Sequence, residues 1–497
     1  MRRINKFLII LIIFIFSGSL SSNSARAKKE TISLNLDEAV KIAIENNLDI
    51  KLAKINSDIK RADLTLTNSI FDTILSLDVN YEEDKLKKVS SFSGTESLIT
   101  NYNFGVSKKF KTGTKIGVDF TNKREHTDST YVTINPAHTS TVKVTATQSL
   151  GENFFGLIDR SKVKVAMLNI EKTDLDTLDR IEQALADVQI NYWKAAYAHK
   201  VVNLKRDMLE KAKNLYNIYK DRYERGMAEK SDLYASEANV KQRQISIKEA
   251  EDKLSTALNI LTLSLNIEFN KDANIKLEDS LNTKPHRDEF IKNLKQAIHS
   301  RRDYQKAHKE LKAQNIEVVR YKNKLWPQID LVASYAKNGL NLDKQKAIDD
   351  IFDEDNPEYY VGINVNFPFE NREDEANYSK ALLEKEKGII ELKKLEASIV
   401  RHLYDKVKKV NLNYEKVNKW KNIVKLQKMK LKEEEKRIQF GRSDSDTLVR
   451  FQEDLLEAEI ALAKSLLDYR ISRVELERAK NQLLDTTSIT SVEDISY

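Results

Sequence analysis

The residues able to do chemistry are few in this sequence, and they are scattered. Cysteine is absent from all 497 residues, which excludes disulfides, thiolate metal sites and a cysteine nucleophile. The seven histidines include no H-E-x-x-H pair, and the chain has no P-loop, no G-x-G-x-x-G and no G-x-S-x-G motif. The sequence therefore shows no recognisable catalytic motif, and we expect a protein that is not an enzyme and has no cofactor and no bound metal.

One acidic segment resembles a set of metal ligands. Asp349, Asp350, Asp353, Glu354 and Asp355 carry oxygen atoms of the kind that bind Ca²⁺. Their spacing differs from that of an EF-hand loop, and a polar surface loop explains the same composition. We expect the polar loop.

Positions that break regular structure are also rare. The 12 glycines and 5 prolines make up about 3.4% of the chain, against roughly 12% in average proteins. So few breakers indicate few turns and long uninterrupted elements. With 32% charged and 40% hydrophobic residues, the chain is expected to be rich in helices, well solvated and able to bury a core. The lack of cysteine also excludes a bacterial lipoprotein anchor.

The N-terminus predicts export. Three basic residues within the first six positions precede an apolar run at 7–16, and an A-x-A cleavage pattern at 25–27 ends the segment. The run is too short to span about 30 Å of hydrocarbon as a helix, so a signal peptide at 1–27 is favoured over an uncleaved anchor. Cleavage removes four positive charges and no acid, which lowers the net charge from +7 to +3. That value indicates a mixed, solvated surface and no nucleic-acid partner.

Two stretches carry an apolar residue at every seventh position, as coiled coils do. The first ladder comprises Ile181, Val188, Ala195, Val202, Leu209, Tyr216 and Tyr223, and the second comprises Leu233, Val240, Ile247, Leu254 and Leu261. Gly226 lies between them and is the only glycine from 157 to 338. We predict a helix over 160–225, about 100 Å long at 1.5 Å per residue, then a sharp reversal and an antiparallel helix. So long a helix must pack sideways against other helices.

Both ladders occur again 215 residues later. The copies are Leu403, Val410, Val417, Val424, Leu431 and Ile438, followed by Leu448, Leu455, Leu462, Tyr469 and Leu476. Gly226 maps onto Gly441 in this second copy. The segments upstream repeat at an offset of 254 to 255, so the first half carries about 40 extra residues in roughly 72–150. The chain is therefore an internal duplication.

Two regions between the helical parts alternate apolar and polar residues. The apolar sets are Leu75, Leu77, Val79 and Tyr81; Tyr102, Phe104 and Val106; Ile116, Val118 and Phe120; Val142, Val144 and Ala146; Ile329, Leu331, Ala333 and Tyr335; and Tyr359, Val361, Ile363, Val365 and Phe367. A membrane barrel and a soluble sheet packed on a core both show this period. Predicted export, and the lack of a globular part to cover a sheet, favour the membrane. Four to six strands cannot close a barrel alone, so a membrane sheet requires oligomerisation.

Together these features resemble the TolC family of bacterial outer-membrane efflux channels, over about 34–484. The most specific match is a helix-turn-helix signature that occurs twice. It reads Tyr223-Glu-Arg-Gly226-Met227 with Ser231-Asp232-Leu233, and Ile438-Gln-Phe-Gly441-Arg442 with Asp446-Thr447-Leu448. The starting segment, Asp37-Glu38-Ala39 through Asn46-Asn47, and the strand exits at 147–150 and 366–369 are also similar.

The resemblance implies a mixed α and β fold: long antiparallel coiled-coil hairpins that form a periplasmic α-barrel, and strands that contribute to a shared trimeric transmembrane β-barrel. It implies a homotrimer in the outer membrane of a diderm bacterium, in contact with outer membrane lipids and with a large periplasmic portion. Such a channel passively conducts substrates from an inner-membrane RND, ABC or MFS-type transporter and a periplasmic adaptor, in tripartite efflux or type I secretion. The alternative is a structural periplasmic coiled-coil scaffold with a soluble β region.

The expected organisation follows the two repeats. It comprises a signal peptide at 1–27; a first repeat at 28–284 with strands at about 72–150 and a helical hairpin at about 158–266; a second repeat at 285–484 with strands at about 327–369 and a hairpin at about 372–484; and a tail at 485–497. The first half departs from the family because it holds four strand candidates rather than two. Six strands per chain would give 18 in a trimer, unless the extra pair forms an extracellular extension.

The resemblance also implies functional residues at the two turns. Gly226, Met227, Gly441 and Arg442 would form the periplasmic tips that dock the adaptor. Family members often place acidic side chains just past the second tip glycine, where they ring the closed aperture. Thr447 and Arg450 stand at the equivalent positions here. Acidic residues still lie close to these two positions in the sequence. The candidate gate residues are therefore Asp232, Asp444, Asp446, Thr447 and Arg450.

Overall fold

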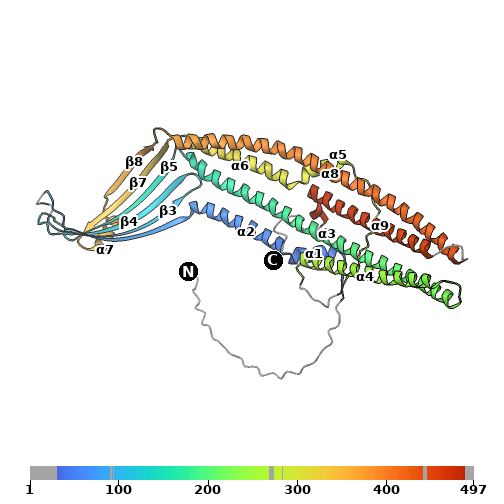
Figure 1. Ribbon diagram of the computed structural model, residues 1–497. Coiled ribbons are helices and arrows are strands. Elements are labelled where there is room, and N and C mark those ends of the chain that lie inside the picture. The colour runs from blue at the N-terminus through green and yellow to red at the C-terminus, as the bar shows by residue number, and fades with distance from the viewer. Residues whose placement is uncertain are drawn as a thin grey trace, which may run out of the picture.

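The computed structural model describes residues 31–89, 92, 94–267, 274–282, 284–439 and 445–486. The molecule is elongated, with an antiparallel sheet at one end and long helices that run from it to the other end (Figure 1). The predicted signal peptide and residues 487–497 of the predicted tail lie outside the described residues.

The helices repeat with the predicted spacing. Helices α3 (Leu157–Glu224) and α8 (Arg372–Gln439) each have 68 residues, and α4 (Lys230–Leu265) and α9 (Ser445–Lys480) each have 36. Both pairs are 215 positions apart. Upstream, α1 (Leu36–Asn46) and α2 (Leu48–Asn68) correspond to α5 (Phe290–Ser300) and α6 (Arg302–Lys324). The internal duplication is confirmed.

All six predicted strands belong to one sheet. They are β2 (Thr73–Asp84), β3 (Ser97–Lys109), β4 (Thr114–Thr127), β5 (Ala137–Ser149), β7 (Gln328–Asn341) and β8 (Pro357–Asn366), in this spatial order. Every neighbouring pair is antiparallel. The extra hairpin of the first half is thus part of the sheet and not a separate extension.

The register places the apolar sets on a single face. One transverse row reads Leu75, Val106, Val118, Val144, Tyr335 and Tyr359 from β2 to β8. The residues between them in sequence are mainly Asn, Ser, Thr, Asp and Lys, and they point to the opposite face. Much of the apolar face is open, since Leu77 is 75% exposed and Val361 is 74% exposed. A soluble sheet would cover such a face.

Two short features were not predicted, and one corrects an expectation. Strands β1 (Thr31–Leu34) and β6 (Asn274–Leu277) form a separate parallel pair. Helix α7 (Lys344–Asp353) includes the first three acids of the segment that was expected to be a polar loop. Asp343 caps α7 by accepting from the backbone N–H of Gln345 and Lys346, at 2.9 and 3.1 Å. Ala347 and Ile351, four residues apart, are buried and give the helix an apolar side.

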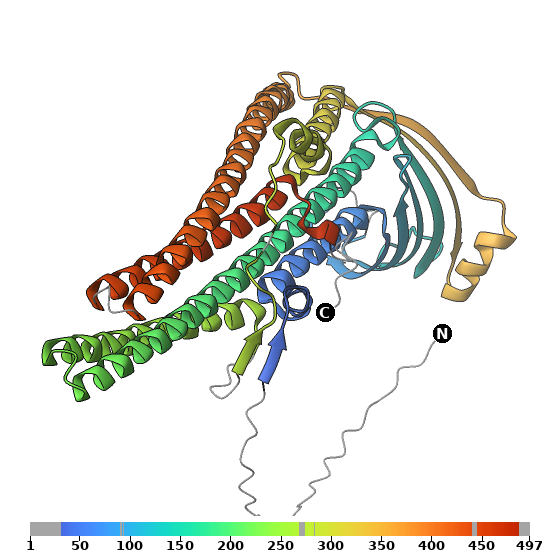
Figure 2. The same ribbon diagram turned by 90° about the vertical axis from the view of Figure 1, so that its right-hand side faces the viewer.

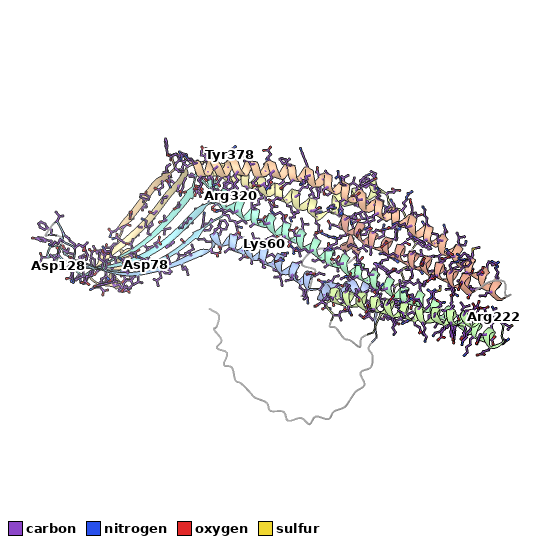
Figure 3. The ribbon with its side chains drawn as sticks, in the orientation of Figure 1. Lys60, Asp78, Asp128, Arg222, Arg320 and Tyr378 are labelled. Carbon is purple, nitrogen blue, oxygen red and sulfur yellow. The ribbon has the colours of Figure 1, made fainter. Side chains whose placement is uncertain are left out.

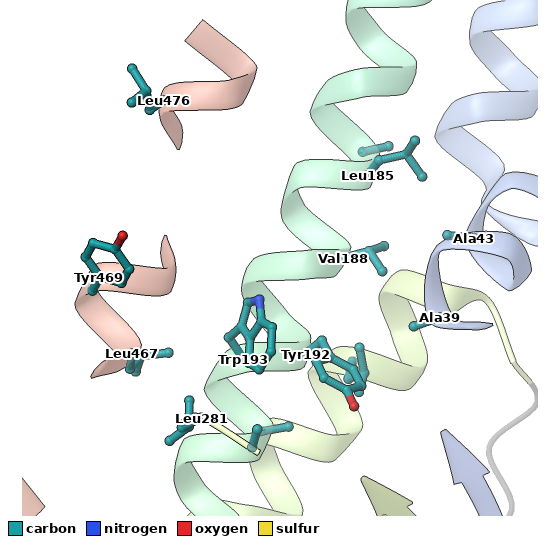
Figure 4. Close-up of a cluster of buried hydrophobic side chains, with 14 of the residues drawn as sticks. Ala39, Ala43, Leu185, Val188, Tyr192, Trp193, Leu281, Leu467, Tyr469 and Leu476 are labelled. Carbon is teal, nitrogen blue, oxygen red and sulfur yellow. The ribbon is translucent and has the colours of Figure 1, made fainter. Parts of the chain in front are cut away.

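The main core lies midway along the helices, where the two repeats meet (Figure 4). Tyr192 and Trp193 of α3 pack there edge to face, with ring centroids 5.4 Å apart. Leu403, Val410 and Val417 of α8 join the same cluster. A second cluster near the far end of the helices joins α3 to α8 and α9.

The two helical pairs lie alongside each other over their distal parts (Figure 2). In the second repeat the predicted ladder is buried from Leu403 to Ile438. In the first repeat burial follows the ladder from Ile181 to Val202 and then shifts to other positions, chiefly Met208, Leu215 and Tyr219. A straight helix drifts about 20° per heptad against a seven-residue repeat, which moves the buried stripe.

Gly388 lies within the continuous helix α8, beside Gln314 of α6. A Cβ at this position would lie 2.1 Å from Oε1 of Gln314, and the end of that flexible side chain would have to move to make room.

Candidate functional site

The first hairpin tip is a glycine turn. Gly226 has φ +69°, its N–H donates to Tyr223 O at 2.9 Å, and the N–H of Met227 donates to Arg222 O at 2.7 Å. This left-handed residue ends α3 and reverses the chain into α4. A Cβ on Gly226 would meet no atom within 4 Å, so its backbone conformation alone requires glycine. Met227 is 64% exposed at the end of the molecule.

An arginine links the first tip to the second hairpin. Arg222 lies at the end of the helices farthest from the sheet (Figure 3), and its Nη2 donates to the carbonyl of Ile438 at 3.0 Å. Ile438 lies in the last turn of α8, where backbone carbonyls lack partners within the helix and carry partial negative charge. Tyr219 is buried beneath this contact, with its ring 5.8 Å from the guanidinium. This bond could not be predicted from the residue types, because its acceptor is a backbone atom.

Two further contacts join helices of the distal part. Arg243 of α4 lies 3.6 Å from the carboxylate of Glu453 on α9. Lys430 of α8 pairs with Asp454 of α9 at 2.6 Å, and its ammonium lies 3.9 Å from the ring centroid of Phe451. The acids at 453 and 454, close to the predicted gate, are therefore engaged in contacts between helices.

The predicted gate residues lie at the starts of two helices. Asp232 is in the first turn of α4, and Asp446, Thr447 and Arg450 are in the first two turns of α9. Within the described part of the chain, Arg450 forms no ion pair with either aspartate. Both acids occupy helix N-termini, where negative charge is favourable.

Three predicted residues at the second tip, Gly441, Arg442 and Asp444, lie outside the described residues.

A buried carboxylate joins the segment directly after α9 to helices of both repeats. Glu182 of α3 is fully buried and forms an ion pair with Arg302 of α6. It also accepts from Nδ2 of Asn481 at 3.0 Å and from the backbone N–H of Leu483 at 2.8 Å. Burial raises the pKa of Glu182, and the guanidinium of Arg302 opposes that rise. The network fixes α3, α6 and the segment after α9 together.

A tyrosine anchors the small parallel sheet to α3. The hydroxyl of Tyr192 donates to the carboxylate of Asp279 at 2.8 Å and lies 3.1 Å from the carbonyl of Leu34. Burial, together with the hydrogen bond to Asp279, raises the pKa of this hydroxyl. The tyrosine thus stays neutral and holds the segments before α1 and after α4 against the core.

The polar face of the large sheet carries more acid than base. Its described carboxylates are Asp78, Glu82, Asp84, Asp119, Glu125, Asp330 and Glu358, and its lysines are Lys109, Lys115, Lys123 and Lys143. These seven acids and four bases alternate with Thr, Ser and Asn. Such a face is suited to water and ions.

Membrane-spanning helices and metal sites are two further kinds of feature to consider among the described residues. No described helix combines the length and apolar character that a membrane-spanning helix needs. Across the same residues, no three His, Asp or Glu side chains come together in a way that could hold a metal ion.

The architecture defines a class: duplicated long helical hairpins attached to one sheet with an apolar and a polar face. Residues 115–266 match the family model described as "Outer membrane efflux protein", a span that includes nearly all of β4 and all of β5, α3 and α4. No curated protein matches the sequence.

Solved structures agree with this class. The chain is similar to the CmeC outer membrane channel of Campylobacter jejuni, with TM-score 0.65 and 15% identity over 90% of this chain and 85% of that one. It is similar to the outer membrane protein VceC of Vibrio cholerae, with TM-score 0.64 and 14% identity over 90% and 96%. The open state of the Neisseria gonorrhoeae MtrE channel gives TM-score 0.64 and 15% identity over 93% and 94%. The chain therefore has the fold of these channels, and part of it matches the efflux-protein family model. Both findings confirm the predicted resemblance.

Proposed function

We propose that this protein is the outer membrane channel of a tripartite efflux or type I secretion system, and that it conducts substrates passively. The observation that carries the proposal is the six-stranded sheet, whose register gathers apolar side chains on one open face and polar ones on the other. Lipid would cover the apolar face, and the polar face would line a wet lumen. Energy would come from an inner-membrane pump.

A single chain leaves both edges of this sheet unpaired. In the part of the chain that the structure describes, strands β2 and β8 each have one neighbour. Unpaired backbone groups are not tolerated in lipid. Because the number of strands is even, β8 of one copy runs antiparallel to β2 of the next, so identical copies can continue the ladder. Three copies would close a barrel of eighteen strands, a size that leaves an aqueous channel.

The helices offer matching edges for the same assembly. Leu48, Leu52, Ile55 and Ile59 form an exposed apolar stripe on α2, which lies at one side of the molecule in Figure 1. Helix α8, at the opposite side, exposes its own apolar side chains, including Leu383, Ile390 and Tyr404. Apolar surfaces on opposite sides suit a head-to-tail contact that closes into a ring.

In this proposal the hairpin tips lie in the periplasm. Gly226 and Met227, with Gly441 and Arg442, would meet the periplasmic adaptor. Asp232, Asp444, Asp446, Thr447 and Arg450 would lie around the aperture of the trimer. The two repeats would divide near residue 285, and a signal peptide at 1–27 would direct export.

The exposed apolar face argues against the alternative of a periplasmic scaffold with a soluble sheet. In water that face would promote aggregation. The discriminating experiment is to purify the protein from the outer membrane, determine its mass in detergent and record currents in planar lipid bilayers. A trimer that forms water-filled pores supports the channel, whereas a soluble periplasmic protein without conductance refutes it.

A further inference from the structure

A hollow of about 430 Å³ lies where the sheet meets the helices, and none of the roles above uses it. It is lined by Phe71, Lys111, Leu157, Arg160, Ser161, Val163, Lys164 and Met167. These residues come from the segment before β2, the turn between β3 and β4, and the first three turns of α3. The lining combines four apolar side chains with three cations and contains no carboxylate.

The three cations are available to a ligand. Among the described residues, Lys111, Arg160 and Lys164 form no ion pair, and Arg160 Nε donates only a long hydrogen bond of 3.4 Å to Gly156 O. The nearby carboxylate of Asp159 is already engaged by Lys109 at 2.6 Å and by Asn153. Three like charges that face one hollow repel each other, so an anion bound there is favoured.

Backbone contacts hold the turn that carries Lys111 against the start of α3. Gly113 and Gly156 both have positive φ, at +76° and +75°. A Cβ on Gly156 would lie 2.3 Å from Lys111 O, and one on Gly113 would lie 2.5 Å from Gly156 N. Only glycine permits this approach, which fixes Lys111 relative to Arg160 and Lys164.

The hollow lies at the edge of the apolar band. On β3 the apolar face runs through Phe104 and Val106, and Lys108 follows on the same face at the end of the strand. Phe110 comes directly after β3 and precedes Lys111 in the chain. Phe110, Phe154 and Phe155 are exposed at this level, and the rings of the last two meet edge to face at 4.8 Å. Exposed aromatic side chains at the end of a lipid-facing band mark the level of lipid headgroups.

We propose that this hollow binds the headgroup of an anionic phospholipid in the leaflet nearest the helices. Lys111, Arg160 and Lys164 would hold the phosphate, and the apolar residues would contact the upper part of the acyl chains. The volume falls within the range of small-molecule sites. The inference rests on the proposed function, since it requires the apolar face of the sheet to lie in a membrane.

The test compares lipids retained by the purified assembly. Protein in neutral detergent is mixed with equal amounts of phosphatidylglycerol and phosphatidylcholine, separated by size exclusion, and its bound lipid is quantified. The variant is K111Q/R160Q/K164Q. The control, K115Q/K143Q/K162Q, removes the same charge from residues outside the hollow. A second variant, K111R/K164R, keeps the charge, and a further sample contains inorganic phosphate as a competitor.

We expect the wild type, the control and the arginine variant to prefer phosphatidylglycerol. Loss of the three cations should reduce that preference about tenfold, with assembly size and thermal unfolding unchanged. Equal retention of both lipids by the wild type, an unchanged preference in the triple variant, or displacement of the lipid by inorganic phosphate would overturn the proposal. A protein that conducts ions but shows no lipid preference refutes this site alone, while one that does not enter bilayers refutes the channel itself.

Discussion

The bond between Arg222 and the carbonyl of Ile438 gives the sharpest prediction about the tips. Its donor is charged, its length is 3.0 Å, and it is partly buried. Hydrogen bonds to charged groups contribute roughly 1.5–3 kcal/mol, and about 2 kcal/mol corresponds to roughly thirtyfold in an equilibrium. Arg222→Met keeps the aliphatic stem and removes the bond. Separation of the last turns of α3 from α8 should therefore become about thirtyfold more frequent.

Amide hydrogen exchange of the assembled protein measures that separation directly. The C-terminal turns of α3 should exchange about thirtyfold faster in the variant, whereas the buried stretch around Tyr192 should be unaffected. Arg225→Met is the matched control. Arg225 is on the same tip, and among the described residues its guanidinium pairs with Asp221 alone, four residues earlier; both side chains are more than half exposed. Such a pair contributes little. Equal exchange in Arg222→Met and the wild type, or the same increase in both variants, would refute the reasoning.

Four further predictions concern other parts of the molecule. Gly156→Ala should lower the thermal unfolding temperature far more than Gly226→Ala. Both glycines have positive φ, but only a Cβ at Gly156 would lie against backbone atoms. Equal decreases in the two variants would contradict this prediction. Glu182→Ala leaves Arg302 buried without its partner and should cost about 3–5 kcal/mol, whereas Glu171→Ala, at a half-exposed pair with Lys309, should cost under about 1 kcal/mol; similar costs would refute the assigned role of the network. The acidic polar face should make the pore cation-selective, so Asp78→Lys with Asp119→Lys should lower the ratio of cation to anion permeability; an unchanged ratio would show that these residues do not line the lumen. Charge reversal at Asp444 and Asp446 should change the conductance. An unchanged conductance would show that these two residues are not part of the gate.

Much of the fold follows from periodicity in the sequence. The ladders from Leu403 and Leu448 and their first copies predicted two helical pairs of equal length, because a helix buried along one side must repeat its apolar residues. Alternation predicted all six strands, since a sheet with two different environments forces a period of two. Gly226 predicted the reversal because a left-handed turn favours glycine.

Other features depend on contacts between distant segments. Helix α7 was wrongly predicted to be a loop. Its sequence is dominated by charged residues, and its apolar side consists of only two buried side chains, Ala347 and Ile351. Strands β1 and β6 have only four residues each, too few for a recognisable period. The hollow beside Arg160 arises only when the turn at Gly113 meets α3. The periodicity of a sequence does not predict such contacts between distant segments.

The central claim is that copies of this chain close one barrel through β2 and β8, and disulfide trapping tests it most directly. The chain has no cysteine, so a pair introduced at Val79 on β2 and at one of Tyr359, Val361, Ile363 or Val365 on β8 is unambiguous. The four variants sample successive registers on the same face of the sheet. Since β2 and β8 are opposite edges of the sheet in each chain, a bond between them must join two copies. We expect at least one variant to yield a covalent trimer in oxidised membranes that reverts to monomer on reduction. Monomers alone in all four variants would contradict the shared barrel.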